Sequence, residues 1–595
     1  MLLGHQTGSE NKNLVGGMSL LALLVSCFCL QIPIKTAYDA NKRAGLVVSS
    51  HDGPLQLYAL LESAHEHLAG VEQLSVVYRA SSEDLDALYD RVQRDFPETL
   101  FLKQRDTHNG QDYKQLLLRA VAACRSEYVI LAADDCIVID DIDVSRAINS
   151  LEQKNAYAFY FNLGANIPYT PKRPVNGPPP PHKQDAETIS WNFCNSAGIW
   201  AQSAMIDMTL FKKEGLLQEL RGIKFTNQRT LKSGLHALHQ ERYKRQAEQL
   251  GRAGASSQRQ HFPSRGLAPL HAQAITLTFN SSNRRPGQEP AYAYTTLDLA
   301  RMFAMGCKIA AHELYHLDTP TTTISLLPHF VLRHKQPDYR HKHIVVVVPS
   351  YNNKDWYQKN LDSIFMQDYD NFDVIYIDDR SPDGTGDLVE QYIREKQEGR
   401  INLIKNTERN LALKNIYRAI HSCADDDIIV CLDGDDWLAD THVLALVNDL
   451  YQDPGVWLTY GQYSIYPFAA SGWLARGCCA EIPAAVIEKN AFRSFTWVAS
   501  HVRTFYAGLF KQIELDDLLY NGEFFAMTWD QAFMFPMLEM ARNNHFRFVP
   551  AILYLYNTAN SINDHKVSRK LQVELEQIIR ARRRYETVDD YHRRA

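Results

Sequence analysis

Several signatures of common protein classes are missing from this sequence of 595 residues. Its ten cysteines form no CxxC pair and follow no regular spacing, which favours a reducing compartment and argues against a structural zinc site. The net charge of -6 gives no reason to expect a nucleic-acid partner. No glycine-rich phosphate loop of the Walker or Rossmann type occurs, so a kinase or a dehydrogenase has no support. What remains is a globular composition and a length that indicates about two to four domains.

Charge is also missing from residues 14–34, a run that is marginally long enough to span a bilayer. Only Lys12 precedes this run with a positive charge, whereas three basic residues follow it within residues 35–43, so the positive-inside rule places the rest of the chain in the cytoplasm. A cleaved secretory signal, with a lipobox-like stretch at residues 24–27, and a true start at Met18 are the alternatives. We expect a membrane-associated protein with cytoplasmic domains, or otherwise a soluble cytoplasmic one.

The second half of the sequence alternates apolar strands with amphipathic helices. HIVVVVPSYNN at 343–353 reads as a strand that runs into a polar loop, and a helical pattern follows it at 356–366. Further apolar strands are expected in FDVIYIDD at 372–379, INLIKN at 401–406 and DIIVCLD at 427–433. This alternation predicts an α/β fold, Rossmann-like, with a mostly parallel sheet that is covered by helices on both faces.

The first half of the sequence repeats this scheme. Its strand patterns AGLVVSS, LSVVYR and EYVILAADD occur in the same order as their counterparts in the second half. Ser50 and Ser81 are 81 − 50 = 31 residues apart, and Ser350 and Ser381 are 381 − 350 = 31 residues apart. We therefore predict two tandem domains of one fold.

Segments without periodicity separate the two halves. The proline-rich residues 168–185 predict an exposed loop, and residues 250–290 a long excursion. A helical pattern at 295–317 follows this excursion. The predicted division is an anchor or signal-like segment at 1–36, a first domain at 37–338, a second at 339–565 and a charged helix at 566–595.

Three carboxylates crowd the sequence CLDGDDW at 431–437, directly after an expected buried strand. In a strand, side chains i and i+2 point the same way, so Asp433 and Asp435 can converge beyond its carboxyl end. Open α/β sheets bind ligands there. A divalent ion would relieve the repulsion, and a set of oxygen ligands favours Mg²⁺ or Mn²⁺ over zinc. A solvated acidic turn, with Asp436 as its third member, is the alternative.

Two further carboxylate positions support a binding site over an acidic turn. Asp378 and Asp379 end the neighbouring strand, and the carboxyl ends of parallel strands share one edge of the sheet. Asp530 lies in AMTWDQAF, at the start of an apolar helix, where an N-cap role is compatible with a catalytic one.

Five motifs together resemble glycosyltransferase family 2. They are VVVVPSYNN, the DDRSPDGT turn, the ALKN helix, LDGDDW, and WDQAF followed by FVPAILYLYN, in the family's order over roughly residues 342–565. The resemblance implies the GT-A fold, a nucleotide-sugar donor, a metal ion at the DxD motif and transfer with inversion. The first half resembles a diverged GT-A domain.

The resemblance also implies roles for residues that bind the donor. Pro349, Ser350 and Tyr351 would shape the first loop around the nucleotide. Asp379 would accept a hydrogen bond from the base, commonly uracil.

For the reacting end of the donor, the resemblance places Asp433 near the ribose and the metal, and Asp435 on the Mn²⁺ or Mg²⁺ ion that bridges the two phosphates. Asp530 matches the catalytic base, which would deprotonate the acceptor hydroxyl. His565 or Lys566 would contact the diphosphate.

The first half departs from this pattern. Counted from the matched serines, Arg79 stands where the base-contacting aspartate is expected, and Ala132 where the first aspartate of the DxD motif is expected. A guanidinium cannot accept a hydrogen bond from uracil. Asp134 and Asp135 remain as a second metal site, with Asp207 as a candidate base. This half is therefore predicted to be either a second transferase or a pseudo-transferase that serves as a glycan-binding scaffold.

A rival motif is HELYH at 312–316, which fits the HExxH pattern of zinc metalloproteases. That pattern needs both histidines on one face of a helix, with the glutamate as base, and His329 or His334 would be the third ligand. Against it, the glycine and third histidine of the metzincins are missing at their spacing.

The prediction is therefore an inverting, metal-dependent glycosyltransferase of the hexosyl or N-acetylhexosaminyl type. Its donor is a nucleotide diphosphate sugar, expected to carry UDP, and its acceptor is a hydroxyl of a glycan, lipid or protein.

Overall fold

The fold is described from a computed structural model of the chain. It describes residues 38–105, 112–166, 182–193, 196, 198–252, 265–277, 294–317, 323–324, 329–335, 337–467, 476–560 and 568–592. Residues 39–595 form one compact unit, so the division into separate domains stays a prediction. The predicted anchor at 14–34 lies outside the described residues, and no described helix is both long and apolar enough to cross a bilayer.

The first half forms a nine-stranded sheet in the order β4-β3-β1-β5-β11-β8-β12-β10-β9. Its strands are β1 (Ala44–His51), β3 (Val71–Arg79), β4 (Leu100–Lys103), β5 (Tyr128–Ala133), β8 (Ala158–Tyr160), β9 (His182–Gln184), β10 (Thr188–Asn192), β11 (Thr209–Lys212) and β12 (Arg265–Pro269). Its longer helices are α1 (Pro54–His67), α2 (Glu83–Asp95), α3 (Tyr113–Ala123), α4 (Val144–Gln153), α5 (Lys213–Gly222) and α6 (Gln228–Arg252).

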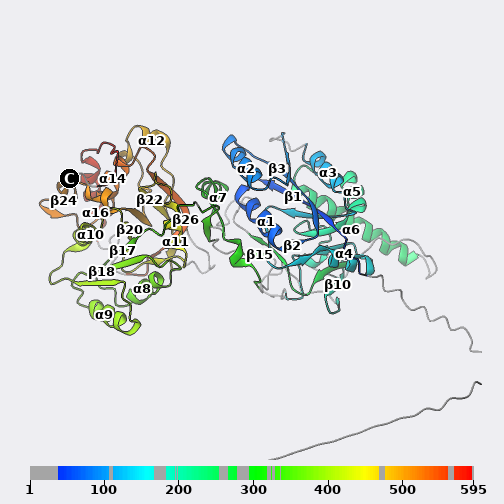
Figure 1. Cartoon of the computed structure of the whole chain (residues 1–595), viewed down its shortest axis with the longest axis horizontal. Coiled ribbons are helices and arrows are strands. Elements are labelled where there is room, and N and C mark those ends of the chain that lie inside the picture. The colour runs from blue at the N-terminus through cyan, green and yellow to red at the C-terminus, as the bar shows by residue number, and fades with distance from the viewer. Residues whose placement is uncertain are drawn as a thin grey trace, which may run out of the picture. The chain divides into compact units, whose positions relative to one another are not determined.

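The second half forms an eight-stranded sheet in the order β19-β18-β17-β20-β23-β22-β26-β21. Its strands are β17 (Ile344–Ser350), β18 (Phe372–Asp378), β19 (Ile401–Lys405), β20 (Ile428–Cys431), β21 (Trp437–Leu438), β22 (Leu458–Tyr466), β23 (Arg503–Tyr506) and β26 (Phe546–Asn557). Its longer helices are α8 (Tyr357–Phe365), α9 (Thr385–Lys396), α10 (Leu411–Ser422), α11 (Val443–Leu450), α14 (Trp529–Met540) and α16 (Arg569–Ala581), and Figure 1 shows α8, α9 and α10 around the strands.

The two sheets have the same connectivity over seven strands. β1 pairs in parallel with β3 and β5, as β17 does with β18 and β20. An antiparallel strand follows in each sheet, β11 beside β5 and β23 beside β20. The central strands β5 and β17 are buried along their whole length, as expected for strands covered on both faces. The prediction of two mostly parallel α/β sheets is therefore confirmed.

Three local predictions for segments after the first α/β units were wrong. Residues 182–184, expected within a loop, form the exposed strand β9, while 167–181 lie outside the described residues. The expected excursion contains β12, which pairs with β8 and β10 inside the sheet. The helix predicted at 295–317 is only α7 (Thr296–Ala304), and the short strand β14 (Cys307–Ile309) follows it. Pairing with distant strands overrides local composition in these segments.

Candidate active site

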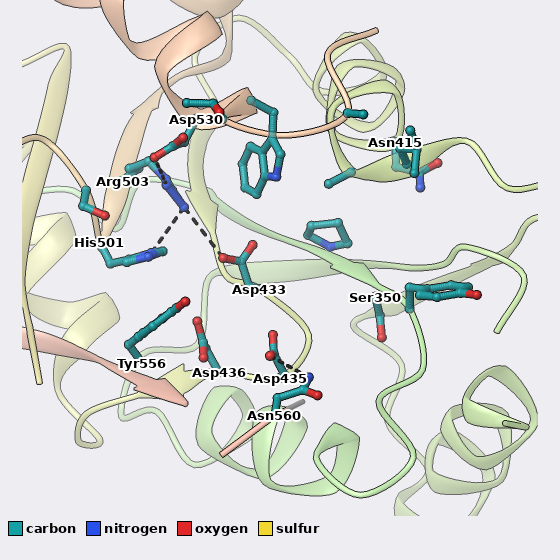
Figure 2. Close-up of a pocket in the computed structure, with 18 of the residues that line it drawn as sticks. Ser350, Asn415, Asp433, Asp435, Asp436, His501, Arg503, Asp530, Tyr556 and Asn560 are labelled. Carbon is teal, nitrogen blue, oxygen red and sulfur yellow. Dashed lines mark hydrogen bonds and ion pairs between the residues drawn. The ribbon is translucent and has the colours of Figure 1, made fainter. Parts of the chain in front are cut away.

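A crevice of about 440 Å³ opens at the carboxyl ends of β17, β18 and β20 (Figure 2). Parallel strands point these ends to one edge of the sheet, so the residues that follow each strand meet there. Predicted site residues from all three loops and from α14 line the crevice: Pro349, Ser350, Tyr351, Asp379, Asp433, Asp435 and Asp530. His565 and Lys566 lie outside the described residues.

The three acids after β20 have different surroundings. Asp436 is buried, and its carboxylate accepts hydrogen bonds from Tyr554 Oη at 2.6 Å and from the backbone N–H of Asn557 at 2.7 Å. Burial raises the pKa of Asp436 well above its usual value, and the charges of Asp435 and Asp433 add to this. Asp436 therefore ties the acidic loop to β26, which is a structural role.

Asp435 points into the crevice, where Asn560 Nδ2 donates a hydrogen bond to its carboxylate at 2.8 Å (Figure 2). Burial raises the pKa of Asp435. The close approach of this loop to β17 depends on Gly434, whose N–H donates to Pro349 O at 3.1 Å. A Cβ atom at Gly434 would lie 2.7 Å from Ser350 Cβ and Oγ.

A cation that the sequence analysis did not identify lies among these acids. Arg503 of β23 is almost fully buried, and its guanidinium is 3.8 Å from Asp433 Oδ2 and 3.4 Å from Asp530 Oδ2 (Figure 2). Burial opposes its charge, but Asp530 and Asp433 outweigh burial and raise the pKa of Arg503. Part of the charge compensation expected from a metal ion therefore comes from the protein itself. The available signal was an arginine inside the apolar run VRTFYAGLF.

His501 contacts the same guanidinium, with its Nδ1 3.2 Å from an Arg503 nitrogen. Burial, followed by the charge of Arg503, lowers the pKa of His501 well below its usual value. A neutral His501 offers a lone pair to Arg503. Together with Asp433 and Asp436 it forms a group whose ligand atoms lie within 4.8 Å of one another.

Asp530 lies in the first turn of α14, where a negative charge is favoured by the helix dipole. The N-cap is Thr528, so the N-cap role expected for Asp530 was wrong. The carboxylate faces the crevice and Arg503 (Figure 2).

Asp379 is held at the other end of the crevice by three hydrogen bonds of 2.8 Å, from Asn406 Nδ2 and from the backbone N–H groups of Asn410 and Leu411. Burial alone would raise the pKa of Asp379, but its hydrogen bonds outweigh burial and lower it. Asp379 is therefore an ionised acceptor with about one of its four acceptor positions left.

Two residues missed by the sequence analysis complete this end of the crevice. The guanidinium of Arg409 lies 3.9 Å from the centroid of the Tyr351 ring. Asn415, in the ALKN motif, lies beside Asp379 and helps to lower the pKa of that carboxyl group. The wall therefore presents a flat aromatic face and an acid flanked by amide groups.

The corresponding position of the first half carries an acid that is already hydrogen-bonded. Ser50 Oγ at 2.6 Å and the His51 N–H at 3.1 Å both donate to the carboxylate of Asp134. The backbone N–H of Asp134 donates to Ser49 O, as that of Gly434 does to Pro349 O, so Asp134 occupies the position of Gly434.

This register corrects the count made from the sequence. Asp135 corresponds to Asp435, and Ala133, not Ala132, corresponds to Asp433. The assignment of Arg79 to the position of Asp379 is confirmed, because Tyr78 pairs with Ser50 as Asp378 pairs with Ser350.

The candidate base of the first half is already paired. Lys232 Nζ of α6 lies 2.8 Å from both carboxylate oxygens of Asp207. Gln228, the first residue of the same helix, donates to Ser49 O at 2.7 Å, so the start of α6 contacts the carboxyl end of β1. Burial, then the charges of Asp134 and Asp207, raise the pKa of Asp135 to about 8.

The zinc metalloprotease arrangement is not formed. Residues 311–314 make a short 3₁₀ helix that ends before His316, so the two histidines of HELYH do not share a helical face. His316 Nδ1 lies 3.2 Å from Asp140, and His334 Nε2 lies 3.0 Å from Asp95 Oδ2. Glu313 instead contacts His329 and His442. The metalloprotease alternative was therefore wrong.

Similar proteins are glycosyltransferases. Glycosyltransferase GlyA of Streptococcus pneumoniae serotype 4 is 25% identical over 188 residues, which are 29% of this chain and 26% of that protein. The putative teichuronic acid biosynthesis glycosyltransferase TuaG of Bacillus subtilis is 33% identical over 98 residues, 16% of this chain and 38% of that protein. The chain thus spans less than half the length of these curated relatives.

Solved structures with a similar part include TarS 1–349 of S. aureus in complex with UDP-GlcNAc, 17% identical, covering 40% of this chain and 65% of that chain with a TM-score of 0.30. Another is the mannosyltransferase PcManGT of Pyrobaculum calidifontis with GDP-Man and Mn²⁺, 19% identical, covering 39% of this chain and 61% of that chain with a TM-score of 0.27. The model of the family "Glycosyl transferase family 2" matches residues 345–513. This segment, which carries the acidic loop and the loops after β17 and β18, therefore belongs to glycosyl transferase family 2.

Proposed function

We propose that the second half transfers a sugar from a nucleotide diphosphate to an acceptor hydroxyl, with inversion at the anomeric carbon. The observation that carries this proposal is the convergence of Asp379, Asp433, Asp435 and Asp530 on one crevice within and beside a family 2 segment. A nucleotide sugar needs a base pocket, a diphosphate site and a reacting centre, and these residues lie in that order from the loop after β18 to the helix α14.

The base pocket fits uracil. The remaining acceptor position of Asp379 suits the N3–H of uracil. Tyr351, with Arg409 against one face of its ring, offers an aromatic face on which a base can stack. The donor is therefore a UDP-sugar, of the hexosyl or N-acetylhexosaminyl type.

The diphosphate site fits a hard divalent ion, because Asp433 and Asp435 offer only carboxylate oxygens. Mn²⁺ or Mg²⁺ held there supplies positive charge to the departing diphosphate. Asn560, which donates to Asp435, fixes the orientation of that carboxylate, and Tyr554 and Asn557 fix the loop through Asp436.

Asp530 is the base at the reacting centre. Its carboxylate takes the proton of the acceptor hydroxyl while the oxygen attacks the anomeric carbon and the bond to the diphosphate breaks. Arg503, 3.4 Å away, holds this carboxylate in place and keeps it apart from Asp433. A single displacement of this kind inverts the anomeric configuration. The acceptor belongs to a glycan, lipid or protein.

The first half acts as a pseudo-transferase in this proposal. Asp134 accepts hydrogen bonds from Ser50 and His51, Asp207 is paired with Lys232, and Arg79 replaces the base-contacting acid. Each of these three differences removes one component that transfer requires. A scaffold for the acceptor or for the second half fits this site better than a second transferase.

A nucleotide-sugar screen with the full chain tests the proposal. We expect Mn²⁺-dependent release of the nucleoside diphosphate from a UDP-sugar, with UDP competing better than GDP or CDP. Asp530→Asn should stop turnover while UDP still binds, because the base acts on the acceptor. Turnover that persists in Asp530→Asn would contradict the proposed base, and tighter competition by GDP would contradict the proposed uracil pocket.

A further inference from the structure

Glu313, His329 and His442 form a second cluster of metal-ligating side chains, outside the crevice. Their ligand atoms lie within 4.8 Å of one another. His442 Nε2 is 2.6 Å from one oxygen of Glu313, and His329 Nδ1 contacts the other. The two imidazole rings are nearly perpendicular, with their centroids 4.0 Å apart. Both rings thus direct a nitrogen at one carboxylate.

Regular elements hold all three residues in place. Glu313 lies in the 3₁₀ helix η4 (Ala311–Leu314), just after β14, and His329 directly precedes β16 (Phe330–Leu332). β14 and β16 pair antiparallel, with Ile309 opposite Phe330, so the two residues leave the same end of one ladder. His442 directly precedes α11. The cluster therefore joins the segment before β17 to a helix of the second half.

Each histidine also has a carboxylate behind its other nitrogen. His442 Nδ1 lies 2.6 Å from Asp368 Oδ2, and His329 Nε2 lies 3.8 Å from Asp440 Oδ2. In metal sites, a carboxylate that accepts a hydrogen bond from the second nitrogen orients an imidazole ligand and raises its basicity. Here both carboxylates are at ion-pair distance and neither forms a hydrogen bond: His442 Nδ1 has no hydrogen-bond partner among the described residues, and 3.8 Å is too long for one at His329.

Charge and space at the cluster also favour a cation. The carboxylates of Glu313, Asp368 and Asp440 all contact the two imidazole rings, which concentrates negative charge at the cluster. A cavity of about 10 Å³, lined in part by His329, Asp440 and His442, adjoins the cluster. That is about the room of one water molecule.

We propose that Glu313, His329 and His442 bind a zinc ion. Two imidazole nitrogens and one carboxylate oxygen favour Zn²⁺ over Mg²⁺ or Mn²⁺, and three protein ligands leave a fourth position for water. Tetrahedral zinc with bonds of about 2.0–2.2 Å separates its ligand atoms by about 3.3 Å. The 2.6 Å between His442 and Glu313 would therefore widen by less than about 1 Å on binding. The absence of CxxC pairs argues only against zinc on thiolates.

When bound, the zinc ion would connect the β14–β16 ladder to the start of α11. Two other contacts already hold these surfaces together: the Leu332 N–H and Tyr339 Oη both donate to Asp449, at 3.1 Å and 2.7 Å. Variants of the cluster should therefore fold, and their metal content can be measured.

The test is the zinc content of the full chain, stripped with a chelator, reloaded with Zn²⁺ and analysed by atomic emission. We expect one tightly bound zinc per chain, and the same in Asp435→Asn, which removes a ligand of the crevice. His329→Ala and His442→Ala should each lose this zinc. His341→Ala, an exposed histidine paired with Asp370 at 3.4 Å, is the matched control and should retain it.

Asp368→Asn keeps all three ligands and should weaken zinc binding by about 10–100-fold. This variant decides the question if circular dichroism shows that a histidine variant does not fold. No zinc in Asp435→Asn, full zinc in both histidine variants, or unchanged affinity in Asp368→Asn would each overturn the proposal. None of these readouts depends on sugar transfer, so the proposal can fail independently of the proposed function.

Discussion

At the scale of single residues, Arg503 decides how the acids of the crevice coexist. β20 and β23 pair antiparallel, so Arg503 on β23 lies opposite Cys431 on β20. Cys431 is two residues before Asp433 in the sequence. This register brings a guanidinium next to a carboxylate that is 503 − 433 = 70 residues away in the sequence. A buried cation of this kind compensates charge only while both partners are present.

Replacing Arg503 by Met should lower the free energy of unfolding by about 3–5 kcal/mol, because it leaves Asp433 and Asp530 without their buried partner. Urea denaturation measures the change. Arg547→Met breaks a more exposed pair with Asp453 and should cost no more than about 1 kcal/mol. Equal losses in the two variants would mean that Arg503 carries no special electrostatic role.

Asp135 should make stability depend on pH. Burial and the charge of Asp134 raise the pKa of Asp135 from 3.8 to about 8. Between these two pH values the folded chain therefore keeps a proton on Asp135 that the unfolded chain has lost. Stability should therefore fall as the pH rises from about 4 to 8, by at least about 1 kcal/mol, in chelator-treated protein. Thermal or urea unfolding across this range measures the slope. Asp135→Asn should flatten it, and a wild-type stability that rises throughout would contradict this account.

At the scale of elements, the ends of β5 and β20 show how one residue opens or closes a crevice. Gly434 lets the loop after β20 pass against Ser350, and Asp435 can then face the open space. In the first half the same position carries Asp134, whose side chain fills that space and accepts from Ser50 and His51. The two sheets have the same strand order here, and they differ in the residue at the turn, which is Gly434 after β20 and Asp134 after β5.

Gly434→Ala should therefore destabilise the second half by about 1–3 kcal/mol and weaken metal-dependent UDP binding. Its added methyl group would lie 2.7 Å from Ser350 and Asn353. Gly399→Ala is the matched control, because a Cβ atom there meets nothing within 4 Å. Titration with UDP and Mn²⁺, together with urea unfolding, compares the two. Unchanged UDP affinity in Gly434→Ala would show that the close approach is unimportant for the site.

At the scale of the whole molecule, the chain contains two sheets of one connectivity, of which one keeps an open acidic crevice. The other has Arg79, a paired Asp207 and a helix, α6, over the equivalent edge. We infer that a duplicated scaffold has one catalytic copy and one supporting copy.

The aligned pair Asp435 and Asp135 tests this division of labour. Asp435→Asn should reduce turnover of the UDP-sugar by at least about 100-fold, since it removes a proposed metal ligand at the departing charge. Asp135→Asn should leave turnover within about twofold of wild type. Steady-state assays on the full chain at one Mn²⁺ concentration measure both. A comparable loss in both variants would indicate two active sites.

Much of this architecture follows from local pattern. Buried parallel strands are continuous apolar runs, and acids directly after them reach the edge where ligands bind, so the sheets and the acidic loop of Asp433 and Asp435 could be predicted. The segment of β12 could not, because RGLAP has no strand periodicity and is a strand only through its pairing with β8 and β10.

The sequence by itself determined the two α/β sheets, the shared spacing of their strands and the acids at the carboxyl ends. Only the tertiary structure placed Arg503 between Asp433 and Asp530, paired Asp134 with Ser50, and gathered Glu313 with His329 and His442. The physical reason is how far apart in the sequence the interacting residues lie. Periodicity and strand ends are set by neighbouring residues, whereas charge compensation and ligand clusters depend on which distant strands and helices pack together.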